Sequence, residues 1–394
     1  MGILFLIVFV DLVGFGVIIP LLPFYGEHFH ASPAAVGVLM AVYSFTQMLT
    51  APLWGNLSDR IGRRPVLIVS LLGITVSYVW LAFADTLWML FAARALGGAM
   101  AGNIATAFAY VADVTTPANR AKGMGIVGAA FGLGFIFGPA IGGALAGHDP
   151  AHADFTSPAL AAAALSGLAT LLTLVLLPES LPKAARRAHA RLTRGSRWQM
   201  LGEALRLPGV GRLILIAVLA TCVFAGMETT FAMWSRRQFG WGPEQNGYLF
   251  AYVGLISAGV QGGLVGRLAH RFGEARLITA GAAALALGML AIPFASSLAL
   301  LAPAMLVVGL GFSLMTPSLN SMVSKAVPAG VQGGTMGVTR SATTLARVVG
   351  PIFAGLLFEY LGKDWPFFVG ALVMAGVVWL AAASRRQVAA HGVE

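Results

Sequence analysis

The feature that most constrains this chain is a series of twelve apolar segments separated by mostly short polar ones. A helix that crosses the hydrocarbon core of a bilayer needs about 20 mostly apolar residues. In lipid the backbone must satisfy its own hydrogen bonds, so apolar runs of this length span as helices. The sequence therefore predicts an all-α membrane protein of twelve transmembrane helices. The predicted spans are 2–24, 34–56, 66–84, 87–111, 122–146, 157–178, 211–235, 245–266, 276–295, 298–322, 334–358 and 365–384.

The composition agrees with lipid as the main solvent of this chain. Hydrophobic residues make up 58% of it and charged residues only 10%, whereas soluble domains carry about 25% charged residues. The single cysteine, Cys222, excludes an internal disulfide and a thiolate metal cluster. The sequence holds no Walker-type phosphate-binding loop and no metal-spaced His/Cys cluster. We therefore expect no bound metal, no cofactor other than a coupling proton, and no enzymatic activity.

The positive charges are unevenly distributed between the two sides of the membrane. If the N-terminus is cytoplasmic, 19 of the 25 Lys and Arg residues lie in cytoplasmic loops and tails, 3 in outer loops and 3 inside spans. Cytoplasmic loops carry such an excess in membrane proteins, so both termini are expected in the cytoplasm. The net charge of +10 does not indicate nucleic-acid binding, because the cations lie in short loops rather than along one amphipathic helix face.

Two sequence markers recur at almost the same spacing. The string GNLSDRIG at 55–62 follows the second span, and GRLAHRFG at 266–273 follows the eighth, 211 residues later. The pair Gly138-Pro139 recurs 212 residues later as Gly350-Pro351. These offsets predict two related six-helix halves, related by an axis along the membrane normal. The expected domains are a six-helix bundle at 1–178, a basic cytoplasmic connector at 179–210 and a second six-helix bundle at 211–394.

Five charged residues lie well inside predicted spans: Asp11, Arg94, Glu228, Arg340 and Arg347. Charges at this depth are costly and usually functional. A carboxyl whose surroundings alternate between apolar and cationic can carry a proton. Asp11 is the first candidate carrier, Glu228 a second or alternative one, and Arg94 the expected countercharge of Asp11. The alternative for each carboxyl is a static partner of an arginine. Three cations against two carboxylates favour anionic, zwitterionic or neutral substrates over dications.

Polar residues form stripes on several otherwise apolar spans. Such stripes are expected to face the bundle interior or a water-filled cavity. Each stripe alone is also explained by hydrogen bonding between helices. Aromatic residues near the charges are candidates for the floor of an apolar pocket. The expected cavity residues are Phe15, Tyr43, Gln47, Phe231, Trp234, Tyr252, Gln261, Asn320, Arg340 and Arg347.

The segment GNLSDRIGRRP at 55–65 is the most specific string in the chain. Its glycines permit a tight turn between two helices. Asp59, at a helix end among three arginines, can hold neighbouring helices together through charge-assisted hydrogen bonds. Topological anchoring by the arginines alone is the alternative. This segment resembles the signature loop of the major facilitator superfamily.

Three further segments resemble the twelve-helix drug/proton antiporters of that superfamily, and most of all the bacterial tetracycline/proton antiporters. They are a first-span motif at 11–23, an arginine motif at 94–113 and a glycine motif at 128–143. Closely spaced glycines leave a smooth helix face, and Pro139 bends its helix, so the fifth span can pack tightly against a span of the other half. The residues expected to act in gating are Gly55, Asp59, Arg60, Gly62, Arg63, Arg64, Asp113, Gly132, Gly138, Pro139, Gly142 and Gly143.

The resemblance implies the major facilitator fold and multidrug efflux, with antibiotic resistance as its effect, from the bacterial inner membrane. We expect a monomer that exports small amphipathic drugs or metabolites in exchange for protons by alternating access. The tetracycline group carries further acidic residues in its third and ninth spans, but the stretches around Ser77 and at 280–291 have none. This departure leaves tetracycline itself open as a substrate. The alternatives are a proton-coupled symporter, a flippase for lipids or other amphiphiles, and a non-transporting receptor.

Overall fold

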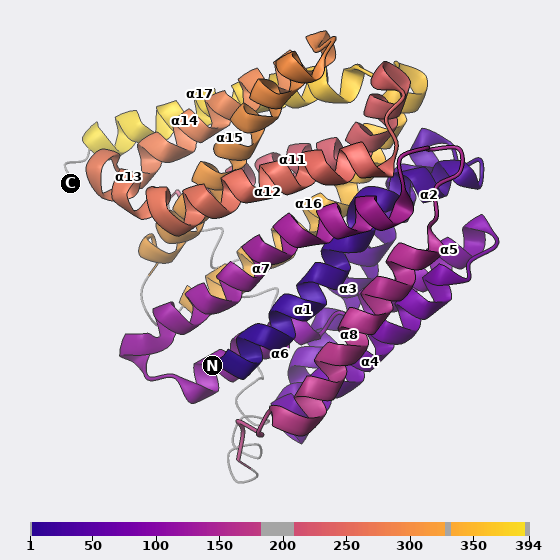
Figure 1. Cartoon of the computed structure of the whole chain (residues 1–394). Coiled ribbons are helices and arrows are strands. Elements are labelled where there is room, and N and C mark those ends of the chain that lie inside the picture. Colours follow the sequence, from indigo (N-terminus) through magenta and orange to yellow (C-terminus); the bar gives the residue numbers. More distant parts are fainter. Residues whose placement is uncertain (1, 183–208, 328–331, 391–394) are drawn as a thin grey trace. The chain divides into compact units, whose positions relative to one another are not determined.

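The computed structural model describes residues 2–182, 209–327 and 332–390, and these form helices and turns without strands. Within these residues, twelve helical segments are long and apolar enough to cross a membrane, from Gly2–His28 to Trp365–Ala382 (Figure 1). Each overlaps one of the twelve predicted spans, so the predicted all-α architecture is confirmed. The basic residues predicted for the connector, Lys183 to Arg206, lie outside the described residues.

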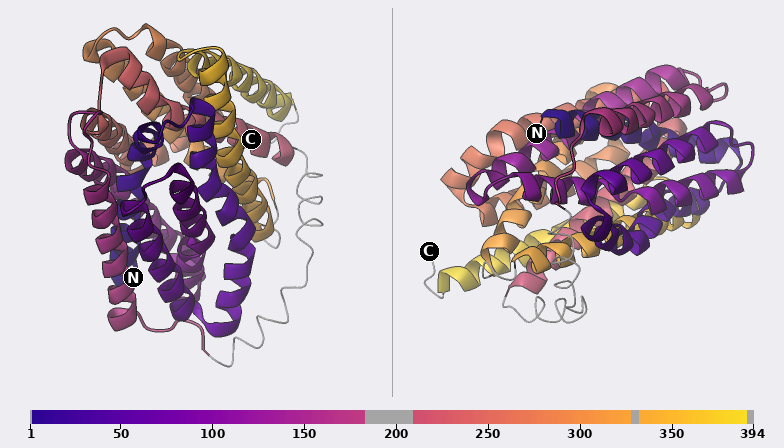
Figure 2. Two further views of the ribbon diagram at one scale, coloured as in Figure 1. Left: turned by 90° about the vertical axis from the view of Figure 1, so that its right-hand side faces the viewer. Right: turned by 90° about the horizontal axis from the view of Figure 1, so that it is seen from below.

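The chain divides into two compact units. Unit 1 comprises Met1–Arg194 and Ser235–Gly254, and unit 2 comprises Gly195–Trp234 and Leu255–Glu394. Figure 2 shows the indigo-to-magenta helices of unit 1 as an antiparallel bundle. The helices of unit 1 are α1 (Gly2–Ile18), α2 (Leu22–His28), α3 (Pro33–Ile61), α4 (Arg63–Ala82), α5 (Leu87–Met100), α6 (Asn103–Val114), α7 (Pro117–Ala146) and α8 (Thr156–Leu176).

Two helices, α11 (Val210–Phe239) and α12 (Pro243–Gly259), are divided between the units. A single π-helical turn, Val260–Leu264, continues α12 into the next helix. The remaining helices of unit 2 are α13 (Val265–Phe272), α14 (Glu274–Ala291), α15 (Leu298–Lys325), α16 (Gln332–Tyr360) and α17 (Trp365–Ala390).

The turn after the second span is much shorter than the predicted loop. Gly55 lies inside α3, which continues to Ile61, and only Gly62 leaves the helix, with φ 110°. An L side chain rarely adopts this conformation, so glycine is needed here and not at position 55. The corresponding turn in the second half also has a glycine with positive φ. It is Gly273, 211 residues later, between α13 and α14, with φ 79°.

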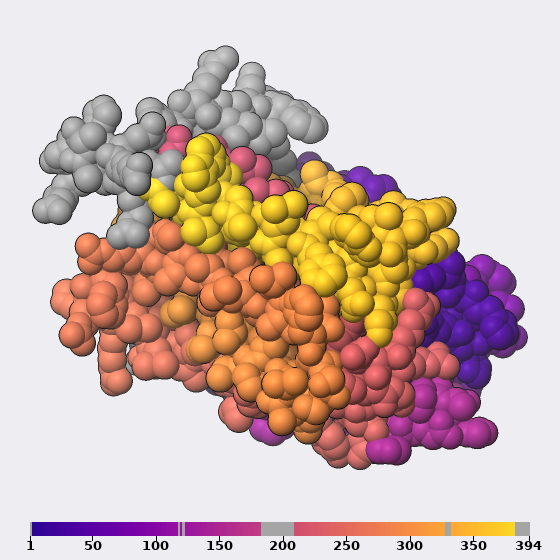
Figure 3. Space-filling model, turned by 90° about the horizontal axis from the view of Figure 1, so that it is seen from above, coloured from indigo at the N-terminus to yellow at the C-terminus, as the bar shows by residue number. Residues whose placement is uncertain are grey.

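The outer surface of each unit is apolar, as a lipid-facing surface requires. Large apolar side chains such as Leu168, Leu372 and Trp379 are exposed. Figure 3 shows orange and yellow residues of unit 2 side by side on the side of the protein that is seen from above. In unit 1, a core of buried apolar residues from α1, α4, α6, α7 and α8 lies beneath such a surface. The helices that form this core also carry the buried polar residues Asp11, Asn103 and Ser166.

Candidate functional site

Asp11 lies at the centre of a buried polar cluster in unit 1. Its side chain is on α1, and the residue is only 5% exposed. Asn103 Nδ2 donates a hydrogen bond to Asp11 Oδ2 at 2.5 Å, and Ser166 Oγ donates to Oδ1 at 3.1 Å. Asp11 forms no ion pair with a described residue. The carboxyl is therefore held by two neutral donors from α6 and α8.

Asn103 reaches Asp11 because the fourth span is broken in its middle. Helix α5 ends at Met100, and α6 begins at Asn103 after a turn at Ala101 and Gly102. The break frees backbone groups that other residues satisfy: Trp54 Nε1 donates to the carbonyl of Ala99 at 2.6 Å. Broken membrane helices are tolerated where protein surrounds the freed backbone. The Gly102-Asn103 pair is a turn signal that could have identified this position, whereas the contact with Ser166 has no local sequence signal.

Arg94 does not have the role of countercharge predicted for it. It is 4% exposed on α5, and its guanidinium carbon lies 4.4 Å from the ring centroid of Tyr43 on α3. It forms no ion pair with Asp11, whose two partners are Asn103 and Ser166.

Two predicted cavity residues of unit 1, Phe15 and Tyr43, lie together beside this arginine. The rings of Phe15 and Tyr43 lie 5.3 Å apart, and Phe135 meets Phe15 edge to face at 6.5 Å. Gln47, one helical turn after Tyr43 on α3, donates to the carbonyl of Ala101 at 3.5 Å. Tyr252 is also in unit 1, on α12, and is half-buried. The structure thus assembles an aromatic wall beside a buried cation.

Unit 2 holds the second buried carboxylate, Glu228. It is 8% exposed on α11 and forms no ion pair with a described residue. Arg347 is half-buried, while Arg340, two turns earlier on α16, is exposed. The sequence placed these charges on their helices correctly, but only the structure shows that neither Asp11 nor Glu228 forms an ion pair with a described arginine.

Phe231 and Trp234, which the sequence predicts to line a cavity, pack against other aromatic rings of unit 2. Both are fully buried on α11. Their rings lie 5.7 Å apart, Trp234 also meets Phe367 at 5.6 Å, and its Nε1 donates to Asp364 at 2.8 Å. These residues form part of the core, where a large ring and one satisfied polar atom are typical of buried tryptophan. The other predicted cavity residues of unit 2, Gln261 and Asn320, are exposed.

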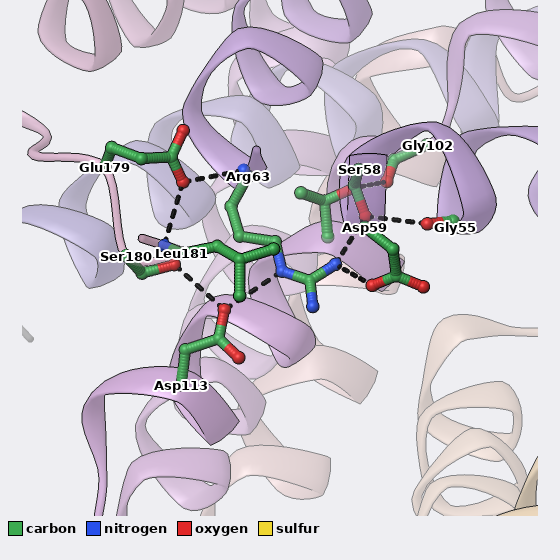
Figure 4. Close-up of polar contacts among 10 residues, drawn as sticks. Gly55, Ser58, Asp59, Arg63, Gly102, Asp113, Glu179, Ser180 and Leu181 are labelled. Carbon is green, nitrogen blue, oxygen red and sulfur yellow. Dashed lines mark hydrogen bonds and ion pairs between the residues drawn. The ribbon is translucent and has the colours of Figure 1, made fainter. Parts of the chain in front are cut away.

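Arg63 organises a charged cluster where α3 turns into α4 (Figure 4). Arg63 is only 4% exposed, and its guanidinium contacts Asp59 at 2.6 Å and Asp113 at 3.0 Å. Its backbone N–H donates to Glu179 at 2.8 Å, and Ser180 Oγ donates to Asp113 at 3.0 Å. The cluster ties α3, α4, α6 and the segment after α8 together. Of the predicted gating arginines, Arg64 bonds the Leu174 carbonyl and Arg60 is exposed.

The glycine motif of α7 lets two other helices approach its backbone. On one face, a Cβ at Gly138 would lie 2.6 Å from the backbone of Gly16 on α1. On another face, a Cβ at Gly143 would lie 2.8 Å from the carbonyl of Pro243, and one at Gly247 would lie 2.3 Å from that of Pro139. Helix α7 therefore packs tightly against both α1 and α12, as its glycines and Pro139 predicted. In unit 2, Gly350 on α16 lies similarly close to the backbone of Cys222 on α11, as Gly138 does to that of Gly16.

We expect Gly138→Ala to destabilise the protein, because its methyl group would meet backbone atoms of Gly16 that cannot move aside. Overpacking of this kind costs about 1–3 kcal/mol. The control is Gly128→Ala on the same helix, where nothing lies within 4 Å of the added Cβ. Thermal unfolding of the two purified variants checks this. Equal melting temperatures would contradict the close contact between α1 and α7.

A second ionic contact lies where α2 ends. Arg236, near the end of α11, pairs with Glu27 at 3.0 Å, and Arg237 approaches the same carboxylate at 3.9 Å. On α12, Glu244 lies 3.3 Å from the exposed ring of His148. Sequence analysis missed Glu27, whose only signal is an acidic residue at the edge of an apolar run.

In the described part of the chain, no group of three His, Cys, Asp or Glu side chains is arranged to hold a metal ion. The twelve membrane-length helices, with buried charges on the helices themselves, define an integral membrane protein. Residues 4–351 and 264–392 match the family model of the Major Facilitator Superfamily. The chain belongs to the Major Facilitator Superfamily.

The chain is similar to several known transporters and resistance proteins. The class C tetracycline resistance protein of Escherichia coli is 34% identical over 364 residues, which cover 90% of this chain and 88% of that protein. Multidrug resistance protein 2 of Bacillus subtilis (strain 168) is 30% identical, covering 93% and 90%. The crystal structure of the human organic anion transporter MFSD10 (TETRAN) has a TM-score of 0.73 at 27% identity, covering 96% of this chain and 98% of that chain.

Proposed function

We propose that this protein exports small amphipathic drugs or metabolites in exchange for protons, by alternating access. The observation that carries the proposal is Asp11, a carboxyl buried in a membrane span and held by neutral donors alone. Intramembrane carboxyls of this kind are typical of proton pathways. Relatives named for tetracycline and multidrug resistance support a drug-like substrate.

The surroundings of Asp11 suit both of its protonation states. The charged carboxylate accepts from Asn103 Nδ2, while Asn103 Oδ1 is buried and has no partner. An amide carries a donor and an acceptor side by side, so half a turn of the Asn103 amide would present Oδ1 instead. A protonated Asp11 would then donate to that oxygen. The cluster can thus take up and release a proton without exposing an unpaired charge.

The remaining features fit a carrier that switches between two states. We propose that the Arg63 cluster closes one end of unit 1 and that the Glu27–Arg236 pair closes the other, since the cluster joins α3, α4 and α6 and the pair joins α2 to α11. The distribution of Lys and Arg supports cytoplasmic termini, and with bacterial relatives it supports the bacterial inner membrane. We further propose that the transporter acts as a monomer and does not bind nucleic acid.

The test uses inside-out membrane vesicles whose lumen is acidified. A proton antiporter accumulates labelled tetracycline or fluorescent amphipathic dyes inside such vesicles, and a protonophore abolishes the accumulation. Accumulation in right-side-out vesicles under an inward proton gradient would instead indicate a symporter. Transfer of labelled phospholipid without any dependence on the pH gradient would indicate a flippase.

A further inference from the structure

Arg94 is a buried cation for which the described protein supplies no counterion. It is 4% exposed, its Nε is fully enclosed without a hydrogen-bond partner, and it forms no ion pair with a described residue. A buried charge without compensation is strongly unfavourable, which is why buried charges are normally paired. An arginine in this state needs an anion from outside the protein.

The other charged groups buried in unit 1 do have partners. Arg63 contacts two carboxylates, and Asp11 accepts two hydrogen bonds. The lack of a partner at Arg94 is therefore a local property of its position and not a general feature of this unit.

The group that the structure places against the Arg94 guanidinium is aromatic: it is Tyr43 on α3. The ring of Tyr43 lies under the guanidinium at 4.4 Å, and Phe15 packs beside that ring. A ligand that satisfied this surface would have one anionic group and a flat apolar body.

We propose that Arg94 binds the anionic group of the transported compound, an organic anion with a carboxylate or sulfonate on an aromatic body. The guanidinium pairs with two anionic oxygens, a geometry that arginine forms and lysine does not. Tyr43 and Phe15 pack against the aromatic body. This assignment deepens the proposed export function, because it names the charge class of the compound that is exported.

The experiment measures binding of 2-naphthalenesulfonate and its uncharged analogue 2-naphthalenesulfonamide to the purified full chain. We expect the sulfonate to bind and to raise the melting temperature of the wild type, and the sulfonamide to do neither at the same concentration. Arg94→Gln should weaken sulfonate binding about tenfold to a hundredfold, the range expected for lost hydrogen bonds to a charged group. Arg94→Lys should retain part of the affinity. Arg267→Gln, which removes an exposed arginine, should bind as the wild type does.

The ligand-free proteins give a second readout. Since the variant loses an unpaired buried charge, Arg94→Gln without ligand should be at least as stable as the wild type. A clearly lower melting temperature would show that the protein itself satisfies the charge, and would overturn the proposal. Equal binding of sulfonate and sulfonamide to the wild type would overturn it as well, and this comparison needs no variant.

The outcomes separate this inference from the proposed function. If sulfonate binds the wild type and Arg94→Gln equally while inside-out vesicles still show proton-driven accumulation, the anion site is wrong and the antiport function stands. If sulfonate binding depends on Arg94 but no compound is accumulated under a pH gradient, the anion site stands and proton antiport fails.

Discussion

Asp11→Asn is expected to reduce proton-driven accumulation in inside-out vesicles to the level of vesicles without the protein. The asparagine side chain has nearly the same shape and can keep its contacts with Asn103 and Ser166, but it cannot take up or release a proton. Exchange of labelled for unlabelled compound, which needs no net proton movement, should persist. The measurement compares these two rates in the same vesicle preparation.

The control for this prediction is Ser166→Ala. It removes one of the two donors to Asp11 and leaves a carboxyl that can titrate. We therefore expect gradient-driven accumulation to continue in this variant. Undiminished accumulation by Asp11→Asn would show that another group carries the proton.

Arg63→Ala should destabilise unit 1. It removes the buried cation that lies between Asp59 and Asp113. Both carboxylates are partly open to solvent and can be hydrated once the arginine is gone, so we expect a cost of about 1.5–3 kcal/mol, the range for lost hydrogen bonds to a charged group. The measurement is the melting temperature of the purified protein in detergent, together with its transport rate.

Arg60→Ala provides the matched comparison for Arg63→Ala. Arg60 lies three residues earlier and carries the same charge, but it is exposed and forms no ion pair with a described residue. Its removal should change stability by less than about 0.5 kcal/mol. If both variants melted at similar temperatures, the arginines would serve as topological anchors alone.

The sequence predicted those properties that depend on local composition. Apolar runs gave the twelve spans because lipid allows only a helix there. The repeated glycines gave the turns at Gly62 and Gly273, since few other residues adopt a positive φ. Helices nevertheless continue beyond the apolar runs, so Gly55 lies inside α3 rather than in a loop.

Properties that depend on contacts between distant helices were not predictable from one sequence. No local sequence pattern indicates that Asp11 contacts Ser166, 155 residues away. Nor does one indicate that Arg94 packs on Tyr43 instead of pairing with Asp11. The same limit explains Trp234, whose polar nitrogen and large ring fit a cavity wall and a core equally well by type. Only its contacts with Phe367 and Asp364 decide for the core.

The central claim is that Asp11 exchanges protons for the exported compound, and proton movement in proteoliposomes tests it most directly. Vesicles of known orientation receive a pH gradient, and a compound that the protein accumulates is added while the internal pH is recorded. The account predicts that the compound dissipates the gradient with the wild type and with Glu228→Gln, but not with Asp11→Asn. Dissipation that survives Asp11→Asn and is lost in Glu228→Gln would contradict it and assign the proton to Glu228.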